Sequence, residues 1–154
     1  MKALKVIISL VVVILIILLV RLPITTTPGF FIGGSATTVP TIWSDTSSTQ
    51  EIELKVSGIP PRVVIIWFVE INNDFYIIGE TDSGWVSMLG DGGPVLMRLR
   101  DSTYALQANL VNSNETNIVR AWQLKYESDY PDFFNTSASE EFLEFSSIYR
   151  LTRM

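Results

Sequence analysis

The side chains that could do chemistry in this sequence are few, and the clearest candidates are charged. Arg62 opens a long apolar stretch, Arg98 and Arg100 fall on one face of a predicted strand, and Glu140 stands beside Glu141. An arginine can bind a phosphate or a carboxylate through the planar fork of its guanidinium. The same residues also have simpler interpretations: Arg62 as a solvated charge at a strand start, Arg98 and Arg100 in ion pairs with carboxylates, and the two glutamates at the solvated start of an element.

Two residue types on which many enzymes depend are absent. The 154 residues contain no His and no Cys, which excludes a Ser-His-Asp triad, a Cys-His pair, a His-ligated haem, a zinc site built from these residues and any disulfide, so we expect no metal site. The net charge of −5 argues against nucleic acid as a partner, because a nucleic-acid-binding protein needs a basic surface. The classes that stay open are a binding module and an enzyme whose reactive atom belongs to a cofactor.

Residues 1–22 predict a transmembrane signal-anchor. The stretch 6–20 is apolar except for Ser9, and with its flanks it reaches the ~17–25 residues that cross a bilayer. A buried core helix would keep a polar face for water, and this stretch has none. A cleaved signal peptide is the alternative, although Arg21-Leu22-Pro23 offers no small-residue cleavage site. The basic residues before the stretch place the N-terminus in the cytoplasm, so we expect a single-pass protein that contacts membrane lipid and has an extracytoplasmic domain.

Residues 23–50 have the composition of a tether. Ser and Thr dominate this stretch and Pro and Gly interrupt it, so it carries too little apolar surface to fold alone. Phe30-Phe31-Ile32 and Ile42-Trp43 are exceptions, and the sequence leaves open whether they lie at the membrane interface or pack onto the domain. The folded domain is then expected over residues 51–154.

The middle of the chain has the pattern of antiparallel strands. Residues 51–56 alternate polar and apolar, whereas residues 62–71 are β-branched and aromatic on both faces, as in a central strand. Asn72-Asn73-Asp74 is a turn signal that predicts a hairpin with the strand that follows. The expected strands are 51–56, 62–71, 75–80, 94–100 and 103–111, with one helical turn at 85–89.

The C-terminal part predicts one long helix and a last strand. Residues 115–130 place apolar side chains at helical spacing until Pro131 stops the pattern, and a loop precedes them at 112–114. A final strand is expected over 141–152. Six strands joined as antiparallel hairpins close into a small barrel more readily than they form a parallel sheet. The expected fold class is therefore mainly β, a small six-stranded antiparallel barrel with one packing helix, preceded by the transmembrane helix.

Several segments between Ile52 and Val111 follow one another in an order known from one protein family. They are Glu53–Gly58, Arg62–Glu70, Asp74–Gly79 and Trp85–Leu89, followed by the helix end at Lys125-Tyr126 and the closing strand at 148–152. In that family a strand ends in a Gly-rich turn, an Arg opens the next strand, and a Trp-containing turn precedes the fourth. The chain thus resembles the FMN-binding split-barrel superfamily, the pyridoxamine-phosphate-oxidase-like fold. It is most similar to the nitroreductase-like branch that depends on the deazaflavin F420.

This resemblance implies a split barrel, usually a homodimer, that holds a flavin, a deazaflavin or haem in a groove. The cofactor ring carries the redox chemistry, and the protein supplies phosphate contacts, a dry face and orientation. By resemblance the cofactor is FMN or F420, with Arg62, Thr81 and Ser83 on its phosphate and Trp85 against its ring.

The turn before Arg62 departs from the family pattern. Pro60 and Pro61 lack the N–H groups that would donate to a phosphate, and Met88 stands where the family's turn has Asn. Two hypotheses follow. The chain is a membrane-anchored, flavin- or deazaflavin-dependent oxidoreductase that acts on a small organic substrate, or it is a cofactor-less split barrel that acts as a binding and interaction module outside the cytoplasm.

Overall fold

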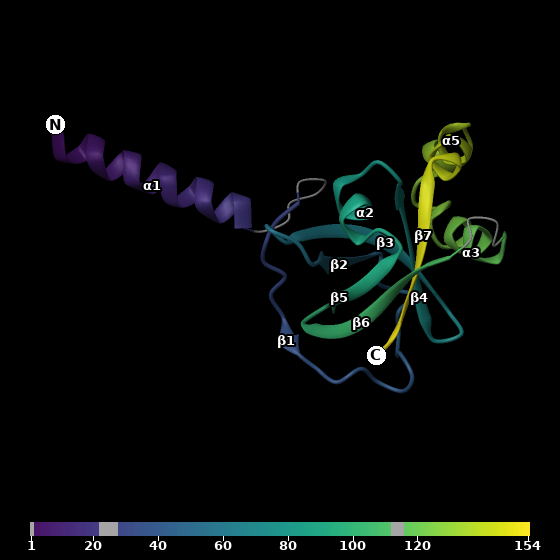
Figure 1. Ribbon diagram of the computed structural model, residues 1–154. Helices are drawn as coiled ribbons and strands as arrows, with labels where there is room; N and C mark the ends of the chain where they lie inside the picture. The colour runs from purple at the N-terminus through teal and green to yellow at the C-terminus, as the bar shows by residue number, and fades with distance from the viewer. Residues whose placement is uncertain (1, 22–27, 112–115) are drawn as a thin grey trace.

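The computed structural model describes residues 2–21, 28–111 and 116–154, and within the first range it describes the side chains of residues 4–17. Figure 1 shows a barrel of strands with short helices around it and the helix α1 standing apart. The loop predicted at 112–114 lies outside the described residues. The elements in chain order are α1 (Lys2–Arg21), β1 (Ser35–Ala36), β2 (Glu51–Val56), β3 (Arg62–Ile71), β4 (Asp74–Glu80), α2 (Gly84–Leu89), β5 (Gly92–Leu99), β6 (Ser102–Val111), α3 (Thr116–Tyr126), α4 (Pro131–Phe134), α5 (Ala138–Glu144) and β7 (Ser146–Arg153).

The barrel consists of six antiparallel strands that form a closed ring. The strands follow one another in the order β6-β5-β2-β3-β4-β7, and the pairing of β6 with β7 closes the ring. The short β1 pairs in parallel with the first residues of β6. Closure satisfies the backbone groups that an open sheet would leave at its edges. The predicted six-stranded antiparallel barrel is therefore confirmed.

The barrel interior holds the larger of two hydrophobic clusters. The alternation predicted for β2 is observed, since Ile52, Leu54 and Val56 are almost fully buried. β3 is apolar on both faces because it separates two layers: Phe68 belongs to the barrel cluster, whereas Val69 belongs to the cluster beneath α3. Burial on both sides makes a slip in the register of β3 costly, because such a slip would exchange the two sets of side chains.

α3 covers the outside of β3 with aromatic side chains. Trp122 and Tyr126 are buried, and the ring of Tyr126 stacks on Trp67 of β3 with 4.5 Å between the ring centres. The helix predicted over 115–130 is shorter than expected, because α3 ends at Tyr126 and Pro131 begins the separate helix α4. Proline suits the first turn of a helix, where its missing N–H has no partner to lose.

The prediction of a strand over 141–152 is wrong for the first residues of this range. Residues 138–144 form the helix α5, and β7 begins only at Ser146. Ala, Glu and Leu favour a helix in this segment, and the ring of Phe142 stacks on Trp122 with 5.7 Å between centres. The barrel therefore carries the short helices α2 to α5 rather than one packing helix.

Residues 28–50, called the strap below, lie along the barrel rather than extending from it as a tether would. Gly29 and Val63 exchange two backbone hydrogen bonds of 2.8 and 2.7 Å. Further along the strap, the guanidinium of Arg153 donates to the carbonyl oxygen of Pro40 at 2.8 Å. A segment poor in apolar residues can be ordered here because the barrel supplies partners for its backbone groups.

The two arginines of the β5–β6 hairpin form the ion pairs that their simpler interpretation predicts. Arg98 Nη1 lies 2.9 Å from Glu53 Oε1, and Arg100 Nη2 lies 3.1 Å from Asp45 Oδ2. Burial raises the pKa of Glu53, and the charge of Arg98 offsets part of that shift. Arg98 also donates to the carbonyl oxygen of Ile32 at 3.2 Å, so both arginines fasten the strap to the barrel.

The strap has two apolar groups whose position the sequence left open, and one residue of each packs onto the barrel. Ile32 and Trp43 are only 7% and 8% exposed. The ring of Trp43 meets those of Phe75 and Tyr104 edge-on, at 4.7 and 4.9 Å between centres, and its backbone N–H donates to Asn73 Oδ1 at 2.8 Å. Trp43 is therefore part of the barrel core, and the folded body includes residues before 51.

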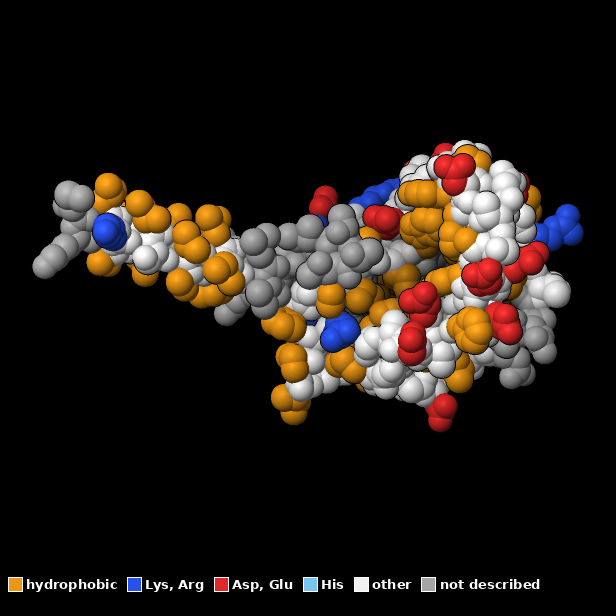
Figure 2. Space-filling view, turned by 90° about the horizontal axis from the view of Figure 1, so that it is seen from above, with side chains coloured by type: hydrophobic (Ala, Val, Ile, Leu, Met, Phe, Trp, Pro, Cys, Tyr) orange, Lys and Arg blue, Asp and Glu red, His pale blue; other side chains and the backbone are white. Residues whose placement is uncertain are grey.

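α1 is apolar around its circumference. Its side chains over residues 4–17 are exposed and are mostly Leu, Val and Ile. Figure 2 shows hydrophobic side chains along the face of this helix that is in view. Within the described ranges, no helix has the length and hydropathy that crossing a membrane requires. The transmembrane helix predicted over 1–22 is therefore not supported by the structure.

Two neighbouring side chains of α3 reach the backbone of β3 at Phe68. The Tyr126 hydroxyl accepts a hydrogen bond from the N–H of Phe68 at 3.0 Å and lies 2.6 Å from the carbonyl oxygen of Gln50. Lys125 Nζ donates to the carbonyl oxygen of Phe68 at 3.0 Å and lies 3.6 Å from the centre of its ring. The pairing of β3 with β2 ends at Trp67, opposite Glu51, so these contacts serve the backbone groups of Phe68, the next residue along β3.

Lys125 is expected to make the stability of the fold depend on pH. Burial lowers its pKa to about 8 from the ordinary 10.5, against a smaller opposite effect of Glu70. Between these two pKa values the unfolded chain keeps the proton and the folded chain has lost it, so the free energy of unfolding rises with pH. Urea unfolding measured between pH 8 and 10.5 should show this rise in the free energy of unfolding for the wild type. The rise should be absent in Lys125→Met and present in Lys55→Met, a control on β2. A parallel profile for wild type and Lys125→Met would contradict the prediction.

Candidate functional site

β3 and β4 are paired only near the turn that joins them. Their register runs from Ile71 with Asp74 to Phe68 with Ile77, and the end of β4 (78–80) pairs with β7 on its other side. The first half of β3 and the end of β4 therefore diverge, which splits the barrel wall. A cavity of about 330 Å³ opens in this split, called the split cavity below. Its volume lies within the usual range for small-ligand pockets, and its lining includes Arg62, Val64, Ile66, Ile78, Ser83 and Trp85.

Three of the four site residues expected from the sequence line the split cavity. Arg62 comes from the start of β3, Ser83 from the turn after β4, and Trp85 from the first turn of α2. The fourth, Thr81, lines a different cavity next to it. The three meet because only three residues separate the end of β4 from the start of α2, directly beside the diverging strands.

The guanidinium of Arg62 rests against the backbone of Gly84. A Cβ atom built on Gly84 would overlap Arg62 Nη1 and Cζ, so only glycine allows this close approach. Within the described part of the chain, the guanidinium of Arg62 has no hydrogen bond and no ion pair. An arginine with five N–H donors and no partner is a suitable group for an anion.

Ser83 places a hydroxyl that lacks a partner at the same cavity. Its Oγ is buried and has no hydrogen bond within the described residues, although its backbone N–H donates to Glu80 O at 3.0 Å. Ser83 stands at the N-cap position of α2, yet its side chain makes no capping bond. A buried hydroxyl without a partner costs about 1–3 kcal/mol, so it indicates either strain or a group that a ligand satisfies.

Trp85 forms one wall of the cavity but is mainly a core residue. It is 7% exposed and lies 5.8 Å from the ring centre of Tyr149. A Cβ on Gly79 of β4 would overlap the indole, so glycine at this position lets the ring pack against the strand. Trp85 can therefore offer a ligand only the small part of its indole that is not packed in the core.

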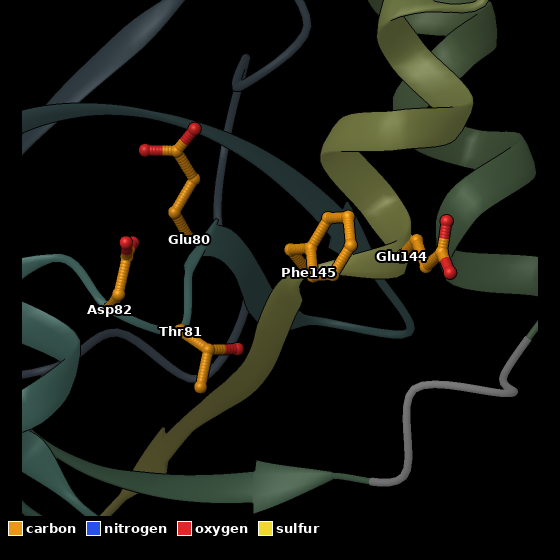
Figure 3. A pocket seen from close by; sticks show the side chains of 5 residues that line it. All are labelled: Glu80, Thr81, Asp82, Glu144 and Phe145. Atoms are coloured by element: carbon orange, nitrogen blue, oxygen red, sulfur yellow. The ribbon is translucent and has the colours of Figure 1, made fainter.

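Thr81 has different surroundings from the other three site residues. It lines a cavity of about 560 Å³ with the carboxylates of Glu80, Asp82 and Glu144, as Figure 3 shows. Its Oγ1 lies 3.0 Å from Ser147 Oγ, so its hydroxyl already has a partner. Carboxylates repel a phosphate, which makes this cavity an unfavourable place for the role that the resemblance implied for Thr81. In the part of the chain that the structure describes, no group of three acidic residues could hold a metal ion.

Sequence reasoning missed the residues that give the site its shape. Gly84 makes room for Arg62, and Phe142 of α5 and Pro28 of the strap complete the lining of the split cavity. A glycine directly before the Trp of the α2 turn was the one local signal for a close approach. No local signal could place Pro28 or Phe142, because each lies far from β3 in sequence.

The fold of this chain has counterparts among solved structures. A candidate pyridoxamine 5′-phosphate oxidase from Listeria innocua is 16% identical, with 67% of this chain and 82% of that chain covered and a TM-score of 0.50. The fold is the FMN-binding split barrel. An FAD- and haem-binding protein from Mycobacterium smegmatis has the same score at 14% identity, over 70% of this chain and 62% of its own. A protein named F420 reductase has a TM-score of 0.48 and is 12% identical, with 75% of this chain and 94% of that chain covered.

These similarities establish the split-barrel fold alone, because all of the identities are low. No protein-family model matches the sequence, and no curated protein matches it. The resemblance expected from the order of segments is thereby confirmed at the level of the fold. The function of a split barrel has to be argued from its site.

Proposed function

We propose that the split cavity binds a flavin or deazaflavin, FMN or F420, and that the chain is an oxidoreductase acting on a small organic substrate. The observation that carries this proposal is the convergence of three groups on one cavity of a split barrel: the unpaired guanidinium of Arg62, the partnerless hydroxyl of Ser83 and the edge of Trp85. When bound, such a cofactor would supply the redox chemistry, for which the chain has no His or Cys.

The residues of the cavity fit the two ends of such a cofactor. Arg62 can hold a phosphate through its planar fork, and Ser83 Oγ can donate to the same anionic group or to a polar atom of the ring. The cavity has an apolar lining, formed by Val64, Ile66 and Ile78, against which a planar ring can pack and displace water. The protein's own contribution in this proposal is to bind the cofactor, orient it and exclude water.

A second candidate function, a cofactor-less binding module, is favoured by the charge of the neighbouring cavity. Glu80 lines both cavities, and Asp82 and Glu144 are close to it. With Arg62 as the cation at the split cavity, this negative charge weakens an anion site. Titration with FMN and with F420 separates the two functions, because a cofactor-less binding module would bind neither.

A single-pass membrane location and a homodimer stay predictions within this proposal. The exposed apolar side chains of α1 over residues 4–17 support contact with lipid. The homodimer rests on the resemblance to split-barrel proteins alone.

Titration of the full-length chain with FMN and with F420, followed by cofactor fluorescence, tests the proposal. Arg62→Ala should weaken binding ~10–100-fold, because a hydrogen bond to a charged group contributes about 1.5–3 kcal/mol. Ser83→Ala should weaken binding less, and it should leave the free chain equally or more stable, since it removes a buried hydroxyl without a partner. Arg120→Ala, an exposed arginine on α3, is the matched control and should bind like the wild type.

Two outcomes would contradict the proposed function. One is a wild-type chain that binds neither cofactor at micromolar concentration, which would favour the binding module. The other is binding that Arg62→Ala and Arg120→Ala reduce equally, because the contact would then not depend on the split cavity.

A further inference from the structure

A second cavity adjoins the split cavity and has a different lining. It measures about 410 Å³, lies between the strap and the turn that precedes β3, and is called the strap cavity below. Its lining includes the apolar side chains of Phe30, Ile59, Pro60, Pro61 and Met88. Arg62 lines both cavities and is the charged residue of this one. The strap cavity therefore combines an apolar surface with one cation.

The walls of the strap cavity are held in place by the chain around them. Pro60 and Pro61 restrict the backbone of the turn, so this wall is rigid before any ligand binds. Met88 reaches over from α2 to Gly58, where a Cβ atom would overlap its methyl group. Gly29 of the strap is tied to Val63 by two backbone hydrogen bonds, which fixes the opposite side. The cavity is thus largely formed in the structure as it stands.

The rim of this cavity exposes apolar side chains to solvent. Ile59 is fully exposed at the tip of the turn, and Phe30 of the strap is 39% exposed. Apolar groups that a soluble surface would avoid, gathered around a concave site, indicate a ligand or partner. The lining carries no carboxylate, whereas the split cavity on the other side of Arg62 is lined by Glu80, so the strap cavity is the more favourable side of this guanidinium for an anion.

We propose that the strap cavity binds a single-chain anionic amphiphile, a carboxylate carried on a hydrocarbon chain. Arg62 pairs with the carboxylate at the inner end, and Phe30, Ile59 and Met88 contact the chain toward the rim. The five donors of the guanidinium can serve an anionic group from either cavity. As a substrate assignment this rests on the proposed oxidoreductase function, whereas the binding itself needs no cofactor.

The methionines of the chain offer a local measurement of this binding. The sequence has four, of which Met88 lines the strap cavity and Met97 is fully buried in the barrel core. The full-length chain, labelled with ¹³C at the methionine methyl groups and held in phosphatidylcholine nanodiscs, is titrated with decanoate below its micelle concentration. We expect a saturable shift of the Met88 methyl signal with Met97 unmoved. Octanoate, which is two CH₂ groups shorter, should bind about 15-fold more weakly, because each buried CH₂ contributes roughly fourfold.

The charge requirement is tested with a neutral ligand and with matched variants. Decanamide, which has the same chain without the charge, should bind about tenfold more weakly than decanoate. Arg62→Gln should weaken the binding of decanoate by the same factor and leave the binding of decanamide unchanged. Ile59→Asp at the exposed tip should also weaken the binding of decanoate. Ile42→Asp should not, because Ile42 is exposed on the strap and lies outside the cavity lining.

The inference is overturned if the Met88 methyl does not respond to decanoate, or if decanoate and decanamide bind equally and Arg62→Gln changes neither. Its failure is separable from that of the proposed function. Ser83→Ala should weaken the binding of FMN and leave the binding of decanoate unaffected, because Ser83 lines the split cavity and not the strap cavity. A chain that binds decanoate but neither FMN nor F420 would end the oxidoreductase proposal and keep the amphiphile site.

Discussion

Trp43→Ala is expected to lower the free energy of unfolding by about 3–5 kcal/mol, the usual cost of truncating a buried aromatic side chain to alanine. The indole fills a place in the barrel core between Phe75 and Tyr104, and its removal would leave a void there. With Ile32, it is one of the two buried hydrophobic side chains of the strap. The variant should therefore lose both barrel stability and the attachment of residues 28–50.

Urea unfolding of the full-length chain measures the first effect, and limited proteolysis of the strap measures the second. Ile42→Ala is the matched control, since Ile42 precedes Trp43 in the strap and is 77% exposed. Its effect should stay within about 0.5 kcal/mol, as for other surface substitutions. If both variants unfolded at the same urea concentration, the strap would not be part of the core.

Tyr126→Phe should cost about 1–3 kcal/mol, because it removes one hydroxyl from a buried network and leaves a backbone donor without a partner. The hydroxyl accepts from Phe68 N–H and lies within hydrogen-bond distance of two carbonyl oxygens, those of Gln50 and Phe68. The phenylalanine keeps the ring that stacks on Trp67, so the change isolates the polar contribution. The burial that surrounds this hydroxyl also raises its pKa above the ordinary value.

Amide hydrogen exchange at Phe68, together with urea unfolding, measures this effect directly. Faster exchange at Phe68 is expected in Tyr126→Phe, since its N–H loses its acceptor. Tyr130→Phe is the control: Tyr130 also contacts the Trp67 ring, at 4.4 Å between centres, but is 38% exposed. Equal losses of stability in the two variants would contradict the prediction, because the buried hydroxyl of Tyr126 would then contribute no more than that of the more exposed Tyr130.

The candidate site was predictable to the extent that its residues lie close together in the chain. Ser83 and Trp85 are two residues apart, and Arg62 opens the neighbouring strand, so a resemblance in the order of segments could single out all three. Thr81 shows the limit of that reasoning. It is as close to Ser83 as Trp85 is, but the pairing of β4 with β7 places it beside Ser147 and the end of α5, in an acidic cavity.

The strap shows the same limit at the level of the fold. Its Ser- and Thr-rich composition is typical of a tether, because composition reports only the apolar surface that a segment carries itself. The structure orders it through partners supplied by the barrel: backbone groups of Val63, the guanidinium of Arg153, and the aromatic rings around Trp43. A fragment that begins at 51 would lack Trp43 and all of these contacts.

Apart from β1 and the start of β7, the strands, their alternation, the closed six-stranded class and the resemblance to split barrels could be predicted from the sequence, because these depend on periodicity and order along the chain. α5 at 138–144 already needed a tertiary partner, since Phe142 packs on Trp122 from a distant helix. The tertiary structure alone decided where β3 and β4 separate, which cavities open there, and that Arg62 stands between them. The physical reason is that a cavity is the space left between segments that meet only after folding, and no local pattern encodes a distance between residues so far apart in the chain.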